Sequence, residues 1–468
     1  MVFSSLIFIY IFLPITLLIY YITPKRFRNL VVFIASILFY AWGEPYYIAL
    51  LLISVIVDYF GAIIVEKTRA DKDKSRFIFV TVLVINISVL FFFKYYGFLI
   101  NNINALCGTS LRVKALPLPL GISFYTFKLV SYMADVYLNK VEAERNFINF
   151  GTYVSMFYQL TAGPIGRFTD LKNQIINRNE TIEKFAYGIQ RFLFGLGKKV
   201  ILANNLSLIW NNVKSMQYGS ISVISSWIGI ISFTLQIYFD FSGYSDMAIG
   251  LGQMMGFEFK ENFDFPYISR SITEFWRRWH ISLGSWFKDY IYIPLGGNRR
   301  GKSRQIFNLC VVWFATGLWH GANWTFVFWG LYYGVIIIIE KLFLLKYLKK
   351  IPKIFGIIYS MIIVTVGWVF FDSESINKAF SYIGIMFGAG NNLMIDNMAK
   401  YLISSNLLIL FISIICATPL VKRIIMYITE KKKTPGIIVS VVISMAIFVI
   451  STAFLVYESY SPFLYFKF

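Results

Sequence analysis

Long apolar segments recur along the whole chain, and short basic segments separate them. About 20 apolar residues are needed to cross a bilayer as a helix, and several segments approach that length. The candidate spans are residues 2–22, 29–42, 47–65, 77–93, 115–137, 222–240, 241–256, 305–320, 324–344, 355–372, 402–420 and 436–456. Hydrophobic residues make up 57% of the 468 positions and charged residues only 15%, unlike a soluble globular protein. The sequence therefore predicts an all-α polytopic membrane protein with about 11–12 transmembrane helices.

The excess of basic residues indicates how the chain is oriented in the membrane. The formal net charge is +20, and Lys and Arg are biased toward the cytoplasmic ends of spans. Basic clusters lie at residues 25–28, 67–76, 299–304, 346–353 and 422–433. If all five are cytoplasmic, twelve crossings place both termini on the extracytoplasmic side. Residues 2–22 are predicted to be a retained span, because the basic residues follow this segment rather than precede it.

Two regions are too polar for ordinary spans. Residues 139–220 and 257–300 mix apolar runs with Lys and Arg, so we predict amphipathic or re-entrant helices on the cytoplasmic side. Non-helical backbone at membrane depth requires protein or a water-filled cavity around it, which predicts a polar cavity lined by these segments. No internal repeat divides the chain, and residues 1–468 are predicted to form one membrane domain.

The chain contains only two histidines, His280 and His320. An ionisable group at membrane depth is a functional candidate, and histidine transfers protons near neutral pH. His320 precedes a Gly-Ala-Asn segment that leaves room for a substrate, so it is predicted to act as a general base toward a hydroxyl. The alternative for His320 is a structural hydrogen bond between helices.

His280 follows Arg277 and Arg278, whose charges would suit an anionic donor at the cytoplasmic mouth of the cavity. His280 itself is predicted to have a positional role or to be a second base. An interfacial amphipathic helix, with tryptophans in the headgroup region and arginines on lipid phosphates, is the stronger alternative for this segment.

Four further residues are candidates for lining a tunnel or binding the donor: Asp240, Ser242, Trp319 and Asn323. Asp240 and Ser242 lie beside a predicted span end, where they would orient a histidine or an arginine, or else cap a helix. No metal site is expected, because two histidines cannot form a three-histidine zinc site and the three cysteines are far apart. The glycine-containing segments at 195–198 and 250–256 do not match nucleotide-binding motifs, and no nucleic acid partner is expected.

An ordered set of motifs resembles one family. The motifs are Pro119-Leu-Gly-Ile-Ser-Phe-Tyr-Thr-Phe127, Ala162-Gly-Pro-Ile165, Tyr238-Phe-Asp-Phe-Ser-Gly-Tyr-Ser-Asp246, Phe263-Asp-Phe-Pro-Tyr267, Phe275-Trp-Arg-Arg-Trp-His-Ile-Ser-Leu283, Tyr292-Ile-Pro-Leu-Gly-Gly297 and Gly317-Leu-Trp-His-Gly321. They resemble the membrane-bound O-acyltransferase family, specifically its bacterial branch of alginate and peptidoglycan O-acetyltransferases, with teichoic-acid D-alanyltransferases as more distant relatives.

The resemblance implies a helical bundle around a central tunnel in which His320 is catalytic and His280 is the second functional position. It also implies a multi-pass protein of the bacterial cytoplasmic membrane, with no bound cofactor. The acyl donor would be a cytoplasmic thioester, either acetyl-CoA or an acyl carrier protein, and basic loops would attract its negative charge. The acceptor would be an extracytoplasmic polysaccharide.

The C-terminus resembles a terminal aromatic motif of this branch. Tyr465 is a candidate acyl relay that would carry the acyl group as a phenolic ester to an extracytoplasmic partner O-acetyltransferase. Aromatic packing or anchoring at the membrane interface is the alternative role for Tyr465.

These features predict a membrane O-acyltransferase that moves an acetyl group from the cytoplasmic thioester toward the polysaccharide. D-alanyl transfer to teichoic acid from a carrier protein is the alternative within the enzyme class. A polysaccharide or lipid transporter is the alternative outside it, although no inverted halves support this reading.

Overall fold

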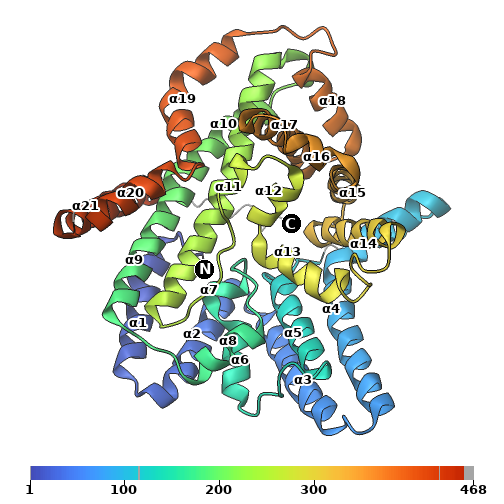
Figure 1. Ribbon diagram of the computed structural model, residues 1–468, viewed down its shortest axis with the longest axis vertical. Helices are drawn as coiled ribbons and strands as arrows, with labels where there is room; N and C mark the ends of the chain where they lie inside the picture. Colours follow the sequence, from blue (N-terminus) through green and yellow to red (C-terminus); the bar gives the residue numbers. More distant parts are fainter. Residues whose placement is uncertain (1, 114–115, 432, 458–468) are drawn as a thin grey trace. The chain divides into compact units, whose positions relative to one another are not determined.

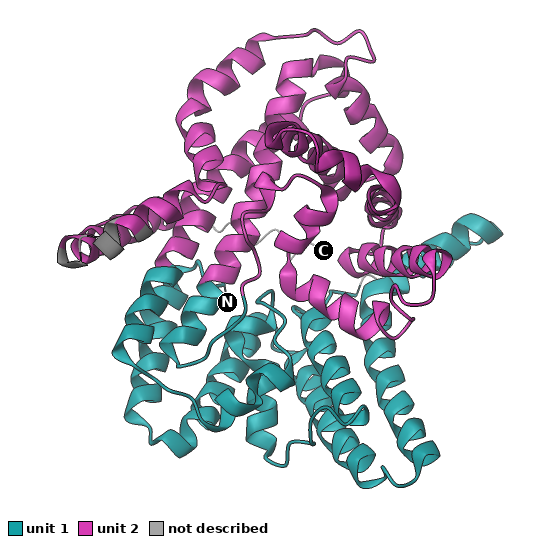
Figure 2. Ribbon diagram, in the orientation of Figure 1, with its two compact units in different colours: residues 1–192, 247–260 teal, residues 193–246, 261–468 magenta. Residues whose placement is uncertain are grey.

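A computed structural model describes residues 2–113, 116–431 and 433–457, and every regular element in these ranges is helical (Figure 1). The chain divides into two compact units (Figure 2). Unit 1 comprises residues 1–192 and 247–260, and unit 2 comprises residues 193–246 and 261–468. The prediction of one membrane domain stays a prediction.

Unit 1 is built mainly from the first third of the chain. Its helices are α1 (Leu13–Ile22), α2 (Arg28–Gly43), α3 (Ile48–Lys67), α4 (Lys72–Cys107), α5 (Ile122–Tyr137), α6 (Phe147–Ser155), α7 (Phe157–Leu160) and α8 (Phe168–Ile176), together with most of α9 (Ile182–Gly197). A π-helical turn, η1 (Phe8–Phe12), leads into α1. Helix α5 forms much of the core of this unit, because its side chains are buried around most of its circumference.

Unit 2 contains both histidines. Its helices are α10 (Asn204–Lys214), most of α11 (Val223–Met254), α12 (Ile272–Arg278), α13 (Ile281–Phe287), α14 (Lys302–His320), α15 (Trp324–Ile339), α16 (Leu345–Leu348), α17 (Lys353–Asp372), α18 (Ile376–Met386), α19 (Asn397–Cys416), α20 (Leu420–Lys431) and α21 (Lys433–Tyr457). Three π-helical segments continue α9, α13 and α15, namely η3 (Lys198–Ala203), η6 (Lys288–Tyr292) and η7 (Glu340–Leu344).

Eight helical segments among the described residues are long and apolar enough to cross a membrane. They are Ile48–Lys67, Lys72–Cys107, Ile182–Lys214, Val223–Met254, Trp324–Leu348, Lys353–Asp372, Asn397–Cys416 and Pro435–Tyr457, and Phe8–Ile22 is a shorter apolar helix. Many of their side chains are exposed leucine, isoleucine, valine and phenylalanine, as expected for lipid-facing surfaces. The prediction of an all-α polytopic membrane protein is confirmed.

Two boundaries differ from the sequence prediction. The predicted spans 222–240 and 241–256 form a single helix, α11. Residues 182–214, predicted to be part of an amphipathic or re-entrant region, form one helical segment long and apolar enough to span. In both places charged residues lowered the apparent hydropathy. The structure pairs those charges within unit 2: Lys198 with Asp246, and Lys199 with Asp240.

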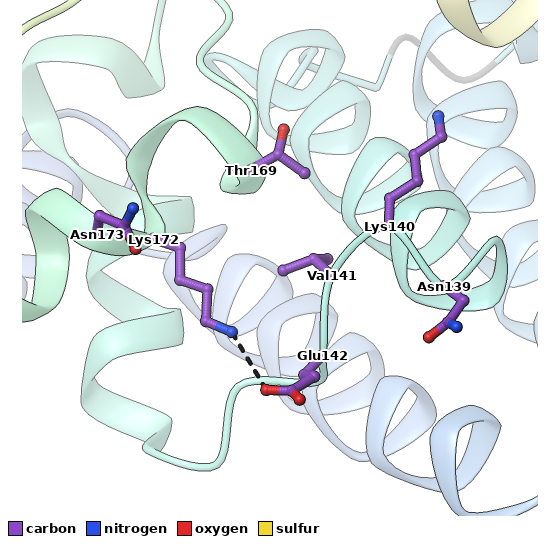
Figure 3. Close-up of a pocket in the computed structure, with 7 residues that line it drawn as sticks. All are labelled: Asn139, Lys140, Val141, Glu142, Thr169, Lys172 and Asn173. Carbon is purple, nitrogen blue, oxygen red and sulfur yellow. Dashed lines mark ion pairs between the residues drawn. The ribbon is translucent and has the colours of Figure 1, made fainter.

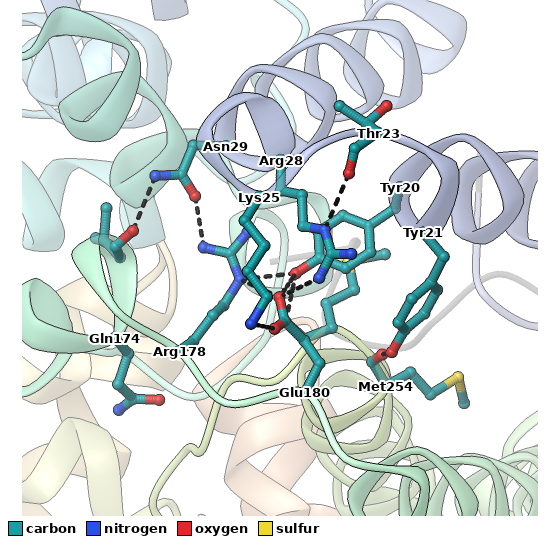
Figure 4. Close-up of polar contacts among 12 residues, drawn as sticks. Tyr20, Tyr21, Thr23, Lys25, Arg28, Asn29, Gln174, Arg178, Glu180 and Met254 are labelled. Carbon is teal, nitrogen blue, oxygen red and sulfur yellow. Dashed lines mark hydrogen bonds and ion pairs between the residues drawn. The ribbon is translucent and has the colours of Figure 1, made fainter.

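A polar cluster in unit 1 joins the end of α1 and the start of α2 to the segment after α8 (Figure 4). The Glu180 carboxylate accepts hydrogen bonds from the Tyr20 hydroxyl at 2.8 Å and pairs with the Arg28 guanidinium at 2.8 Å. Arg178 donates to the Tyr20 hydroxyl through Nε and to Asn29 through Nη1. Burial opposes ionisation of Glu180, but the hydrogen bonds from Arg28 and Tyr20 outweigh it and hold its pKa below the ordinary value.

Candidate active site

The α14–α15 hairpin places His320 at the last position of α14. A Cβ atom on Gly317 would lie 2.4 Å from the Phe326 carbonyl oxygen, and one on Gly330 would lie 2.3 Å from the Trp313 carbonyl oxygen. Only glycine permits this approach, so the two backbones pack in direct contact, as is common between membrane helices. His320 is buried at the end of the hairpin, with 3% of its surface exposed.

Aromatic rings surround the His320 imidazole. Its centroid lies 4.8 Å from the Trp329 ring, 5.3 Å from the Phe371 ring and 4.8 Å from the ring of its neighbour Trp319. Trp329 belongs to α15 and Phe371 to the end of α17. Three elements of unit 2 therefore hold the ring in one orientation among apolar surfaces.

The second histidine lies at the corner between α12 and α13. His280 has φ 45° and ψ 53°, a left-handed conformation that is uncommon outside glycine but is tolerated by histidine, asparagine and aspartate. Its ring contacts the Phe241 ring at 4.7 Å and the Trp319 ring at 5.9 Å. Because Trp319 contacts both imidazoles, the structure brings His280 and His320 into one buried cluster, although forty positions separate them in the sequence.

Asn262 makes a polar contact with the His280 ring. His280 Nδ1 lies 3.2 Å from Asn262 Oδ1. Both residues are buried, with 2% and 1% of their surfaces exposed. Burial lowers the pKa of His280 well below its ordinary value of 6.5, because a low dielectric disfavours the imidazolium. His280 lies outside the eight candidate spans and is a neutral imidazole at neutral pH.

The helix that leads to His280 is capped by a carboxylate from another part of the chain. Glu340, fully buried at the start of η7, accepts hydrogen bonds from the backbone N–H groups of Ile272 and Thr273, each at 2.7 Å. Ser271 accepts from the N–H of Glu274 at 3.0 Å. These bonds satisfy the N–H groups that the first turn of α12 leaves without intrahelical partners, and the negative charge suits the helix N-terminus.

Helix α11, which Figure 1 shows between α10 and α12, contacts different partners on different sides. One face carries Tyr238, Phe241 and Ser245 toward the His280 loop, where their partners are Trp279, His280 and Asn262. Asp240 and Asp246 lie on other sides of the helix and pair with Lys199 and Lys198.

The Asp240 carboxylate lies 2.6 Å from the Lys199 ammonium, and both side chains are buried. The helix-capping alternative for Asp240 and Ser242 is wrong, because both residues lie inside α11 and not at its end. The partner of Asp240 in this contact is a lysine, whereas the sequence predicted a histidine or an arginine. Ser242 is buried on the same helix.

The other predicted site residues have identifiable structural contacts. Arg278 pairs with Asp264 at 2.8 Å and with Glu274 at 3.0 Å, whereas Arg277 is exposed. Asn323 caps α15 by accepting from the N–H of Thr325 at 3.0 Å. The predicted roles of Arg277, Arg278 and Asn323 at a donor site stay predictions.

Tyr465 lies outside the described residues. Unit 1 has a separate polar pocket of about 400 Å³, lined by Asn139, Lys140, Val141, Glu142, Thr169, Lys172 and Asn173 (Figure 3). The Lys172–Glu142 pair crosses this pocket at 3.5 Å. The described residues contain no group of three or more His, Cys, Asp or Glu side chains that could hold a metal ion.

Sequence reasoning missed Asn262 and Glu340. Asn262 immediately precedes the Phe263–Tyr267 motif. This position next to a motif was the only feature of the sequence that could have indicated a role for Asn262. Glu340 is an acidic residue in a predicted span, which marks a functional candidate in principle, but nothing in the sequence indicates that its partner is α12.

The fold and the site together define a multi-pass, all-helical membrane protein with two histidines in one buried aromatic cluster. The model of the MBOAT, membrane-bound O-acyltransferase family, matches residues 140–371, which include both histidines. The chain belongs to the membrane-bound O-acyltransferase family and is an O-acyltransferase.

Individual relatives cover most of the chain. The Probable alginate O-acetylase AlgI of Pseudomonas syringae pv. tomato is 43% identical over 84% of this chain and 76% of its own length. The Peptidoglycan O-acetyltransferase of Helicobacter pylori is 32% identical over 86% of this chain and 82% of its own length. The Teichoic acid D-alanyltransferase of Streptococcus thermophilus is 30% identical over 48% of this chain and 58% of its own length.

Proposed function

We propose that this O-acyltransferase is an acetyltransferase of the bacterial cytoplasmic membrane. It takes acetyl groups from a cytoplasmic thioester, acetyl-CoA or an acyl carrier protein, and passes them across the membrane for O-acetylation of an extracytoplasmic polysaccharide. Both termini are extracytoplasmic in this proposal. A separate extracytoplasmic O-acetyltransferase completes the transfer.

The observation that carries the proposal is the convergence of the two histidines on Trp319. Acyl transfer from a thioester to a hydroxyl requires a base that removes the hydroxyl proton. In the proposed reaction His320 takes this proton while the hydroxyl oxygen attacks the thioester carbonyl carbon. The carbon–sulfur bond then breaks, and the leaving thiolate recovers a proton from the imidazolium. The buried aromatic surroundings exclude water, which would otherwise hydrolyse the thioester.

The choice of an acetyl group rests on the relatives. The alginate and peptidoglycan O-acetyltransferases match over more than four fifths of this chain, whereas the D-alanyltransferase matches over about half of it. The distribution of basic clusters supports a cytoplasmic approach of the negatively charged donor.

The test is release of free thiol from acetyl-CoA by the full-length protein in liposomes. We expect turnover by the wild type and its loss in His320→Ala and in His280→Ala. His280→Asn is a useful companion, because asparagine tolerates the left-handed backbone of this position but cannot accept a proton as imidazole does. Each variant is first checked for an unchanged thermal unfolding profile.

The control variant is Glu374→Gln, a change of an exposed side chain outside the contacts of the two histidines, which should keep both the unfolding profile and turnover. Labelled acetate on an added acceptor separates transfer from hydrolysis. Turnover only with a carrier-bound D-alanyl thioester would replace the acetyl proposal by D-alanyl transfer. Movement of labelled glycan without any acyl transfer would replace it by transport.

A further inference from the structure

Asn262 is the centre of a small hydrogen-bond network that reaches the His280 ring. Its Oδ1 atom accepts from the backbone N–H of Ser282 at 3.2 Å and from the Ser282 hydroxyl at 2.8 Å. Its Nδ2 atom donates to the Ser245 hydroxyl at 3.1 Å. The backbone N–H of Ile281 donates to the backbone carbonyl oxygen of Asn262 at 3.0 Å. The oxygen and the nitrogen of the Asn262 side-chain amide are thus both held by hydrogen bonds.

The orientation of the Asn262 amide follows from one of these contacts. Oxygen and nitrogen of an asparagine amide have to be assigned from their partners. The backbone N–H of Ser282 can only donate, so the atom that faces it has to be the acceptor Oδ1. In the reversed orientation the NH₂ group would face that N–H in a buried site, which costs free energy because both donors are left unsatisfied.

The fixed amide determines where His280 carries its proton. Since Oδ1 can only accept, the Nδ1 atom 3.2 Å away has to be the donor. In a neutral imidazole one nitrogen is protonated and the other carries the lone pair, and the hydrogen bond at one nitrogen decides which. We propose that Asn262 is a positioning residue that holds the proton of neutral His280 on Nδ1, so that Nε2 is the nitrogen that accepts from a substrate group.

The arrangement also fixes the direction of the ring. Phe241 contacts the imidazole nearly edge to face, with an interplanar angle of 89°, and Trp319 contacts it at 65°. The left-handed backbone at His280 is held by the α13 bond from the Gly284 N–H to the His280 carbonyl oxygen, at 3.0 Å. Rotation of the ring would break the Asn262 contact and collide with these neighbours. The lone pair of Nε2 is therefore presented in one direction only.

This inference rests on the proposed function for its catalytic meaning but not for its test. Because the chain has only two histidines, a full-length His320→Gln protein labelled with ¹⁵N-histidine gives the ring signals of His280 alone. We expect a protonated Nδ1 and an unprotonated Nε2 in His320→Gln at pH 7.5. We expect this pattern to be lost in His320→Gln/Asn262→Leu, where the Asn262 oxygen no longer faces Nδ1.

The matched control for the spectrum is Asn308→Leu in the same background. Asn308 is an equally buried asparagine of unit 2 whose Nδ2 donates to the Leu295 and Gly297 carbonyl oxygens. This change perturbs a buried amide without touching the His280 network, so the His280 signals should not move. A proton on Nε2 in His320→Gln, or an unchanged His280 pattern after Asn262→Leu, overturns the inference even if acetyl transfer is confirmed.

Activity supplies the second readout in proteins that keep His320. Asn262→Asp retains an acceptor and adds a negative charge beside Nδ1–H, which favours the imidazolium. We expect kcat/KM of Asn262→Asp to fall below that of the wild type at the acidic end of the pH range, with near wild-type turnover restored at high pH. Asn262→Leu should lose at least tenfold at every pH. Equal pH profiles for wild type and Asn262→Asp would contradict the positioning role.

Discussion

The ion pair between Lys199 and Asp240 gives a prediction with a defined magnitude. The two charges lie 2.6 Å apart, and only 5% and 2% of the two side chains are exposed. Removing one partner of such a pair leaves a buried charge without compensation and costs about 3–5 kcal/mol. Replacing both partners by apolar residues of similar size is often nearly neutral. We therefore expect Lys199→Met and Asp240→Leu each to lose about 3–5 kcal/mol, and the double variant to lose less than either.

The assay is thermal and denaturant unfolding of the full-length protein in detergent, followed by tryptophan fluorescence. The control is the exposed pair of Glu374, just before α18, and Lys378 in its first turn, where Glu374→Gln should leave the free energy of unfolding nearly unchanged because exposed ion pairs contribute little. If the pair is structural, the double variant also keeps thioester turnover. A double variant that loses the sum of the two single losses would refute the reasoning.

Three further outcomes are expected. Glu340→Gln keeps one acceptor oxygen but turns an NH₂ group toward a backbone N–H of α12, so it should lose about 2–4 kcal/mol and reduce kcat, whereas a loss equal to that of exposed Glu374→Gln would contradict the cap. Burial lowers the folded-state pKa of His280, so the unfolded chain binds the proton more readily below pH 6.5. The contribution of His280 to stability is therefore fully present above about pH 6.5 and is lost as the pH falls, with a slope of at most about 1.4 kcal/mol per pH unit. Unfolding between pH 7.5 and 5.5 should accordingly depend less on pH in His280→Leu than in the wild type, and equal slopes would count against it. Tyr465→Phe should keep thiol release but abolish transfer to the polysaccharide with the partner present; full transfer by Tyr465→Phe would exclude the relay.

The sequence predicts the fold class because hydropathy reports directly on membrane spans. It marks the two histidines as candidate functional residues because ionisable residues are rare in apolar surroundings. It does not predict that 222–240 and 241–256 join into α11. Asp240 and Ser242 interrupt the apolar run there, and a single sequence does not reveal that Lys199 neutralises Asp240 inside the protein. The same pair explains why the segment 182–214 looked too polar to span.

The contacts that organise the site are long-range, which is why residue patterns did not reveal them. Asn262 is 18 positions from His280, and Glu340 is 68 positions from Ile272. Each side chain by itself suits many local environments, and only the folded chain identifies the N–H groups that it meets. Asn323 is the opposite case, since its cap on α15 is local and follows from its position before Trp324.

Contacts on different sides of α11 fix the rotation of this helix about its own axis. Inserting one residue between Tyr238 and Asp246 would turn the following part of the helix by about 100°, which would move Ser245 away from Asn262 and Asp246 away from Lys198 at once. A substitution that weakens the lysine pairs, Lys198–Asp246 and Lys199–Asp240, therefore displaces the loop around His280 without contacting that loop directly. Suppressors of defects in the lysine pairs should accordingly appear among the residues around His280, which α11 contacts through Phe241 and Ser245.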